Sequence, residues 1–162
     1  MAADTMDMFS DTKHFGMMKV RKGTRSLYGF AGAVREMPQV FEWLDRRENN
    51  IDHPNSWPKD DVENCDKFDA ILVIEGDSHG ENGHPRSDPT IYRIAIGGIC
   101  IQYTDMPQFI AIGAGAPFAL GAMHAGASAP QAVAASIRYD LCSGGKVNTI
   151  QFEKGKGGHE HA

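Results

Sequence analysis

Apolar residues along this chain fall into short runs that polar or glycine-rich stretches separate. Runs of four to eight residues that alternate between apolar and polar, or are apolar throughout, are typical of β-strands. The clearest run, at residues 68–74, reads Phe-Asp-Ala-Ile-Leu-Val-Ile. We predict strands at residues 17–21, 26–32, 68–74, 90–96 and 109–112, and a short strand pair at 97–104. A terminal strand is expected to contain Val147, Thr149 and Phe152. Met1, Ala2 and Ala3 are expected to form the end of a buried strand.

Three further stretches have apolar residues at helical spacing. The first forms an apolar stripe from Val34, Met37, Phe41 and Leu44. We expect Pro38 to lie in the first turn of this helix, where a missing backbone N–H is tolerated. A second helix, rich in small residues, is predicted at 117–125 and ends at Gly126. Ser128, with Gln131 three residues later, predicts the capped start of a third helix.

The remaining stretches read as connections. We expect a loose polar stretch after Asp4 and an exposed connection with a short helix at residues 48–67. Residues 75–89 read as a long hairpin loop. This loop contains Asp77, His79, Glu81 and His84, but their spacing matches no metal motif, and a solvated loop tip is the favoured interpretation. The tail at 153–162, rich in glycine, lysine and histidine, is predicted to be flexible.

The order of these elements favours an α+β fold. Strands and helices do not alternate strictly, as they would in a doubly wound parallel sheet. Two mainly antiparallel sheets packed together, with helices outside them, fit the order better. At 162 residues, the chain is expected to form one domain over residues 1–152 with a core of its own.

Composition removes several classes of function. A formal charge of −5 argues against a general nucleic-acid binder, and no apolar run is long enough for a membrane span. Three cysteines, Cys65, Cys100 and Cys142, form no CxxC pair, which indicates free thiols in a reducing compartment. The expected location is therefore the cytoplasm.

The turn at residues 138–145 is the most unusual local sequence. Asp140 falls at the end of the third predicted helix, where its carboxylate meets the negative end of the helix dipole, at a cost of about 0.3–1 kcal/mol. A lysine, a bound cation, or the Ser143 hydroxyl with nearby amide groups would offset this cost. The group therefore reads either as part of a site or as a polar cap followed by a tight Gly144-Gly145 turn.

Several residues elsewhere in the chain are of types that take part in catalysis. An aspartate such as Asp4 beside a buried Lys19 would keep the ammonium charged, and that charge would lower the pKa of a neighbouring hydroxyl nucleophile. A glycine at a strand end, such as Gly32, presents an unobstructed N–H as an oxyanion donor. Each signal is weak alone, because a lysine on a strand face is usually only solvated.

Taken in order, five motifs resemble the proteasome β-subunit family, including the bacterial two-component protease whose peptidase ring works with a separate ATPase. The resemblance covers residues 1–152, with 48–67 and 75–89 unmatched. The motifs are Ala2-Ala3-Asp4, Lys19-Val20, Gly29-Phe30-Ala31-Gly32, Ile112-Gly113-Ala114-Gly115-Ala116 and Asp140-Leu141-Cys142-Ser143-Gly144-Gly145.

The resemblance implies a four-layer αββα sandwich of the N-terminal-nucleophile hydrolase type. It implies that Asp4 and Lys19 tune the nucleophile, that Gly32 is the oxyanion-hole glycine, and that Asp140 and Ser143 contact the N-terminal amine. It also implies a homo-oligomeric ring, an ATPase unfoldase partner and polypeptide substrates. No cofactor is required, but a structural monovalent or divalent cation is implied on the backbone carbonyls of Tyr139, Cys142 and Gly145.

Two positions depart from the family pattern. Ala114 replaces the serine of its Gly-Ser-Gly motif, and no residue matches the threonine nucleophile, which would lie about a dozen residues before Met1. We therefore expect a threonine-type endopeptidase in which Met1 is an internal methionine, so that the chain beginning there is catalytically silent. A non-catalytic ring subunit and an amidase of the same fold are the alternatives.

Overall fold

The computed structural model describes most of the chain up to Phe152. The described residues are 1–4, 6–9, 12–15, 18–47, 62, 64–65, 67–75, 89–95, 99–103 and 108–152. The predicted metal-free loop tip at 77–84 and the predicted tail at 153–162 lie outside this range.

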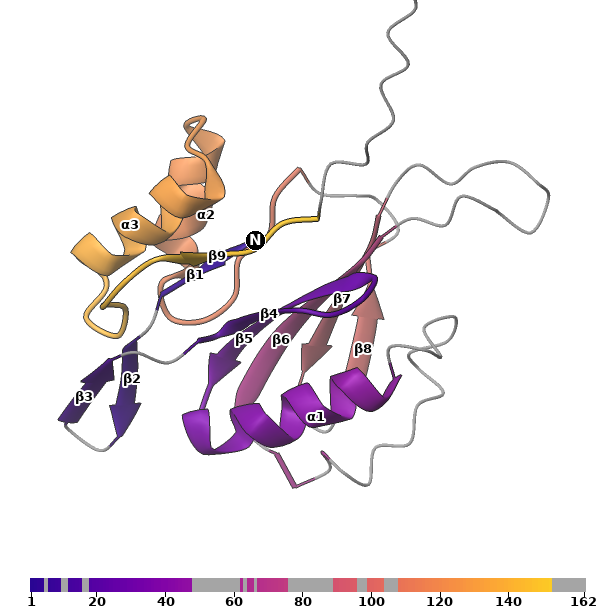
Figure 1. Cartoon of the computed structure of the whole chain (residues 1–162). Helices are drawn as coiled ribbons and strands as arrows, with labels where there is room; N and C mark the ends of the chain where they lie inside the picture. The colour runs from indigo at the N-terminus through magenta and orange to yellow at the C-terminus, as the bar shows by residue number, and fades with distance from the viewer. Residues whose placement is uncertain are drawn as a thin grey trace, which may run out of the picture.

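A five-stranded antiparallel sheet is the centre of the fold (Figure 1). Its strands pair in chain order, from β4 (Val20–Lys22) and β5 (Ser26–Gly32) through β6 (Phe68–Ile74) to β7 (Thr90–Ala95) and β8 (Ile99–Gln102). The strands expected at 26–32, 68–74 and 90–96 are confirmed. The expected strand at 17–21 begins only at Val20, and one strand, β8, stands among the described residues where a strand pair was expected.

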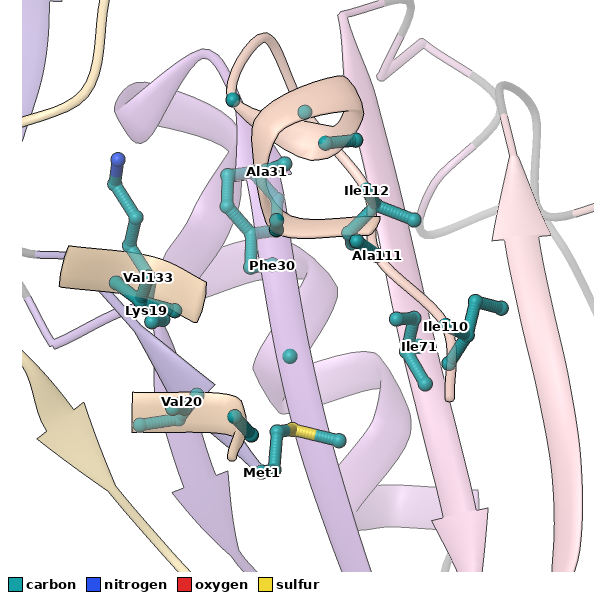
Figure 2. A pocket seen from close by; sticks show the side chains of 18 of the residues that line it. Met1, Lys19, Val20, Phe30, Ala31, Ile71, Ile110, Ala111, Ile112 and Val133 are labelled. Atoms are coloured by element: carbon teal, nitrogen blue, oxygen red, sulfur yellow. The ribbon is translucent and has the colours of Figure 1, made fainter. Parts of the chain in front are cut away.

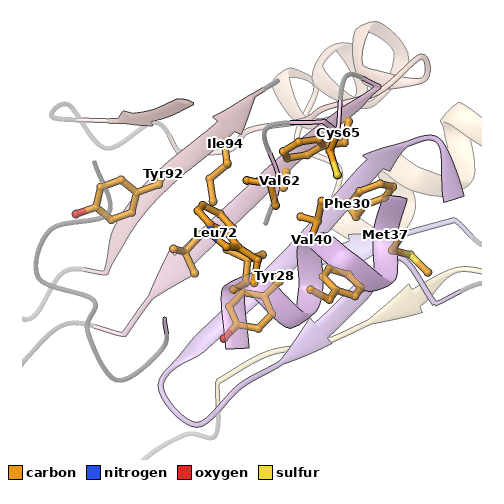
Figure 3. Packing of buried hydrophobic residues seen from close by; sticks show 14 of the residues in the cluster. Tyr28, Phe30, Met37, Val40, Val62, Cys65, Leu72, Tyr92 and Ile94 are labelled. Atoms are coloured by element: carbon orange, nitrogen blue, oxygen red, sulfur yellow. The ribbon is translucent and has the colours of Figure 1, made fainter. Parts of the chain in front are cut away.

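Helix α1 (Met37–Arg47) covers one face of this sheet and follows the short 3-10 helix η1 (Val34–Glu36). Pro38 is in the first turn of α1, as predicted, and the apolar stripe of the helix points to the sheet. Alternate residues of β5 and β6 form the other half of the core, so Phe30 stacks on Phe68 with ring centroids 6.2 Å apart. Figure 3 shows this packing, in which each fully buried large side chain contributes about 1.5–3 kcal/mol.

Two residues of the connection at 48–67 correct the prediction that it is exposed throughout. Val62 and Cys65 are both buried in the same core, between α1 and the sheet. The sequence pattern hid them, because each is an isolated apolar residue among polar neighbours. The rest of this connection, apart from Asn64 and Lys67, lies outside the described residues.

A second, smaller pairing involves both ends of the described chain. Strand β1 (Ala2–Ala3) runs antiparallel to β9 (Asn148–Thr149), so a strand is present at each expected place. Val147 and Phe152, expected in the terminal strand, lie outside β9, and β1 is half-buried and not buried as predicted. The stretch after Asp4, expected to be loose, instead contains a hairpin of β2 (Met6–Phe9) and β3 (Thr12–Phe15). Their alternation is short and interrupted by polar residues, so it gave no strand signal.

Helices α2 (Ala116–His124) and α3 (Ala129–Tyr139) pack against each other as an antiparallel pair. Gly126 lies between them at a φ of +92°, a backbone conformation that glycine adopts readily. The predicted cap is present: the Ser128 N–H donates a hydrogen bond to Gln131 Oε1 at 2.8 Å.

The segment at 109–112 is not a strand, although its sequence predicted one. Its residues are apolar and only partly buried, and no hydrogen-bonding strand lies beside them in the described chain. A strand is defined by its ladder, so an apolar run without a neighbouring strand remains irregular.

The elements form four layers, with α1, the five-stranded sheet, the β1–β9 pair, and α2 with α3 in that order (Figure 1). Met1 marks the contact between the two sheets, because a Cβ added to Gly29 of β5 would lie 2.9 Å from its sulfur. The predicted α+β class with a four-layer αββα sandwich is therefore confirmed. No helix in the described part of the chain is long and apolar enough to cross a membrane.

Candidate functional site

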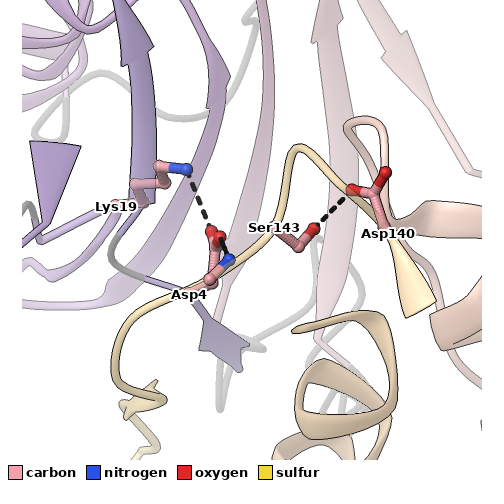
Figure 4. Close-up of polar contacts among 5 residues, drawn as sticks. Asp4, Lys19, Asp140 and Ser143 are labelled. Atoms are coloured by element: carbon pink, nitrogen blue, oxygen red, sulfur yellow. Dashed lines mark hydrogen bonds and ion pairs between the residues drawn. The ribbon is translucent and has the colours of Figure 1, made fainter. Parts of the chain in front are cut away.

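An ion pair between Asp4 and Lys19 lies where the layers meet. Lys19 Nζ donates to Asp4 Oδ1 at 2.9 Å, and the two side chains are only 12% and 14% exposed (Figure 4). Asp4 follows β1 and Lys19 precedes β4, so the pair joins the two sheets. The interpretation of Lys19 as a solvated surface lysine is wrong.

The second oxygen of the same carboxylate has another partner. Asp4 Oδ2 accepts a hydrogen bond from the backbone N–H of Gly144 at 2.8 Å, so Asp4 connects Lys19 to the turn after α3. Hydrogen bonds that involve a charged group contribute about 1.5–3 kcal/mol each. Asp4 therefore fixes the position of the Lys19 ammonium relative to that turn.

The turn after α3 resolves the unfavourable position of Asp140. This residue ends the helix, and the Ser143 hydroxyl donates to Asp140 Oδ2 at 2.7 Å (Figure 4). The Ser143 N–H also points to the Asp140 carbonyl, at 3.3 Å. Gly145 follows at a φ of +78°, which completes the reversal of the chain. The local groups of the turn thus offset the repulsion from the helix dipole.

Gly32 ends β5 in a conformation that excludes other residues. Its φ is +135°, and a Cβ there would lie 2.1 Å from the carbonyl oxygen of Lys67. The Ala33 N–H donates to that same oxygen at 2.7 Å. The buried carboxylate of Glu36 accepts the Lys67 N–H at 3.1 Å, so it holds the strand end from the other side. Gly32 is therefore required by packing, whatever its chemistry.

The loop before α2 packs tightly against both α3 and the turn. A Cβ on Gly115 would lie 2.6 Å from Ser143 Oγ and 2.8 Å from Ser136 Cβ. Ser136 Oγ donates to the Gly115 carbonyl at 2.9 Å and lies 3.2 Å from the Ala132 carbonyl. Sequence reasoning missed this role of Ser136. The available signal was a hydroxyl on the apolar face of α3, four residues after Ala132.

A cavity of about 1010 Å³ separates the two sheets and reaches these groups (Figure 2). Its lining is mostly apolar, with Lys19 and Asp4 among the few charged side chains. Of the predicted site residues, the cavity is lined by Asp4, Lys19, Gly32, Cys142 and Ser143. Asp140 reaches the group only through Ser143.

The α-amino group of Met1 also lies at this cavity. It donates a hydrogen bond to the Ile150 carbonyl at 2.8 Å. Burial lowers the pKa of this amine below its usual 8.0, because the charged form loses hydration.

A metal ion is held in proteins either by side chains or by backbone carbonyls. Among the described residues, no group of three or more His, Cys, Asp and Glu side chains is placed to hold a metal ion. The predicted cation ligands are instead the carbonyls of Tyr139, the last residue of α3, and of Cys142 and Gly145 in the turn after it. A cation on these carbonyls stays a prediction.

The fold defines a class of architecture, the four-layer αββα sandwich. Within this class, the fold is similar to those of two solved structures, HslV and a bacterial protein named BPH. HslV from Trypanosoma brucei superposes with a TM-score of 0.63 at 15% identity, over 91% of this chain and 88% of that one. Thiobacillus denitrificans BPH, solved in complex with epoxomicin, gives 0.59 at 18% identity over 92% and 89%. No family model and no curated protein matches the sequence.

Proposed function

We propose that this chain is a subunit of a threonine-type endopeptidase of the proteasome and HslV kind. The observation that carries the proposal is the contact of one buried carboxylate, Asp4, with both Lys19 Nζ and the Gly144 N–H. The pair also joins the two sheets, but a largely buried ion pair is weak evidence for stability, because well-packed apolar residues often stabilise a protein as well or better.

Lys19 has an electrostatic role in the proposed reaction. Its ammonium, paired with Asp4, would lower the pKa of the hydroxyl of an N-terminal threonine. The α-amine of that threonine accepts the hydroxyl proton while the oxygen attacks the peptide carbonyl. The Gly32 N–H stabilises the oxyanion, and the amine then returns the proton to the leaving nitrogen. Water releases the acyl group in a second step.

Asp140 and Ser143 hold the amine in place under this proposal. The Ser143 hydroxyl lines the cavity and is itself oriented by Asp140, at 2.7 Å. Ala114 offers no hydroxyl here, so the amine has one polar neighbour fewer than the family pattern provides. The proposed reaction requires a threonine at the amino end of the mature protein, because its α-amine and hydroxyl act together.

Assembly and partners extend the proposal. A homo-oligomeric ring would enclose the site, and an ATPase would feed it unfolded polypeptide. The turn at 139–145 would carry a structural cation on the carbonyls of Tyr139, Cys142 and Gly145, a hard-ligand set of the kind that suits alkali or alkaline-earth ions. The proposed chemical step does not use this cation.

The deciding experiment starts from the protein purified from its native source. Its amino terminus is determined by intact mass and sequencing, and its turnover of fluorogenic peptides is measured with and without epoxomicin. We expect an N-terminal threonine, turnover, and inhibition. The 162-residue chain serves as the reference and is expected to give no turnover.

Variants of the native-length protein test the assignment. Lys19→Ala should lower kcat/KM at least a hundredfold, whereas Lys22→Ala, an exposed lysine three residues along, should change it less than twofold. Turnover that survives Lys19→Ala would contradict the mechanism. A native amino terminus without a threonine, together with no turnover, would identify a non-catalytic ring subunit.

A further inference from the structure

Glu36 is a buried carboxylate that the proposed reaction does not use. Among the residues that the structure describes, it is the charged residue with the least exposure, at 6%. It is the last residue of the 3-10 helix η1, four positions after Gly32. A carboxylate loses its hydration on burial and needs hydrogen-bond donors in place of water. The donors that Glu36 contacts therefore indicate what it holds in place.

The two oxygens of Glu36 face different groups. Oε2 accepts a hydrogen bond from the Lys67 N–H at 3.1 Å, directly before β6. Oε1 lies 3.7 Å from the Arg35 guanidinium, whose side chain is 69% exposed. Because water screens an ion pair with so exposed a partner, the pair contributes little. The hydrogen bond to Lys67 is thus the contact that ties Glu36 to the central sheet.

The backbone of Lys67 is held on both sides. Its N–H is bound by Glu36, and its carbonyl accepts the Ala33 N–H at 2.7 Å. Gly32 lies directly against the same carbonyl, since a Cβ on Gly32 would be 2.1 Å from that oxygen and 2.6 Å from Phe68 Cα. The peptide group that limits the position of Gly32 is therefore itself placed by Glu36 and Ala33.

The direction of the Gly32 N–H follows from the ladder of β5. The Phe30 N–H donates to the Lys19 carbonyl at 2.9 Å. N–H groups two residues apart in a strand point to the same edge, so the Gly32 N–H also points to the edge of β5 where Lys19 lies. This N–H is the group that stabilises the oxyanion in the proposed reaction. Its exact position depends on the packing of Gly32 against the Lys67 carbonyl.

We propose that Glu36 is a positioning residue for this oxyanion donor. Its carboxylate fixes the Lys67 backbone, the Lys67 carbonyl fixes Gly32, and Gly32 presents its N–H to the reacting carbonyl. The inference rests on the proposed function, because the oxyanion forms only in that reaction. An oxyanion donor stabilises the transition state more than the bound substrate. Loss of the Glu36 acceptor therefore lowers kcat and leaves KM near its wild-type value.

Two variants of the native-length protein differ mainly in the acceptor. Glu36→Gln keeps an oxygen that can accept the Lys67 N–H, whereas Glu36→Met fills a similar volume without one. We expect Glu36→Met to lower kcat at least about tenfold, because a displacement of about 1 Å costs up to about a hundredfold. Glu36→Gln should keep kcat within about threefold, and KM should stay within about twofold in both. Glu36→Ala also lacks the acceptor and replaces Glu36→Met should that variant not fold.

Val40→Ala separates positioning from a general loss of stability. Val40 lies one turn after Glu36 on the sheet side of α1 and is fully buried, so its truncation leaves a cavity in the same core. The hydrogen bonds of Lys67 do not involve it. We expect Val40→Ala to lower the urea midpoint at least as far as Glu36→Met does, while kcat changes less than about twofold.

Hydrogen exchange of the Ala33 amide reports the positioning without turnover. This amide donates to the Lys67 carbonyl and should exchange at least about tenfold faster in Glu36→Met, and close to the wild-type rate in Glu36→Gln. The Gly23 amide, which donates to the Ser26 carbonyl beyond the other end of β5, is the internal reference and should keep its rate.

The outcomes separate this inference from the proposed function. If the wild-type native-length protein shows no turnover, the proposed function fails and the inference fails with it. If the wild type is active and Glu36→Met keeps its kcat, only the inference fails, and faster exchange at Ala33 would then assign Glu36 a purely structural role. An equal fall in kcat for Glu36→Gln and Glu36→Met, or a raised KM at constant kcat, would also overturn the inference.

Discussion

The Asp4 carboxylate accepts a hydrogen bond from the Gly144 N–H at 2.8 Å, although 140 positions of sequence separate the two residues. The same carboxylate pairs with Lys19. One side chain therefore joins the end of β1, the residue that precedes β4 and the turn after α3. This contact is the feature on which both stability and the proposed chemistry depend.

Replacing Asp4 should destabilise the protein. Asp4→Ala leaves the ammonium of Lys19 largely buried without its partner and leaves the Gly144 N–H unsatisfied, which should lower the free energy of unfolding by about 3–5 kcal/mol. Urea denaturation measures it. Asp45→Ala is the control: its carboxylate pairs with Arg21 in a more exposed position and should cost less than about 1 kcal/mol. Equal losses in the free energy of unfolding for the two variants would show that burial does not strengthen the Asp4–Lys19 pair.

Gly32→Ala should be severely destabilising. The new Cβ would collide with the Lys67 carbonyl at 2.1 Å, and backbone there cannot move aside cheaply. We expect a loss of more than about 3 kcal/mol or no soluble protein. Gly121→Ala is the matched control, since nothing lies within 4 Å of its Cβ and helix α2 should gain about 0.5–1 kcal/mol. A loss of stability below about 1 kcal/mol for Gly32→Ala would contradict the close approach of residue 32 to the Lys67 carbonyl.

Ser136→Ala should cost about 1–3 kcal/mol, because the Gly115 carbonyl would lose its hydrogen bond in a buried position. The loss should be accompanied by faster hydrogen exchange in residues 113–116, which the serine fixes to α3. Thermal unfolding and exchange measured on the same sample test both parts. If the variant kept wild-type stability and hydrogen exchange, the Ser136 hydroxyl would contribute only through its bond to the Ala132 carbonyl in its own helix and not through Gly115.

A chain with a free amine on Met1 should become more stable as the pH rises toward 8. Burial lowers the pKa of that amine in the folded state below the usual 8.0. Between the two values the unfolded chain binds more protons, so the free energy of unfolding increases with pH through this window and levels off above it. Urea titrations across this pH range measure the slope. An α-acetylated chain should lack this contribution, and identical slopes would contradict it.

The sequence by itself determined the central sheet and the helices. Residues 68–74 and 26–32 carry an apolar pattern strong enough to predict β6 and β5, and Ser128 with Gln131 marked the start of α3. The motifs also pointed to the fold and to Asp4, Lys19, Asp140 and Ser143. These features are local, because periodicity and caps depend on neighbours within a few residues.

Tertiary structure alone decided the rest. Residues 109–112 are as apolar as a strand, yet they do not form one, because no strand among the described residues lies beside them to share hydrogen bonds. Val62 and Cys65 are buried because α1 and the sheet enclose them, which no local pattern indicates. Ser136 matters because Gly115 comes within hydrogen-bonding distance across 21 positions. Ladders, enclosure and such contacts join residues distant in sequence, and their energies depend on what the folded chain brings together.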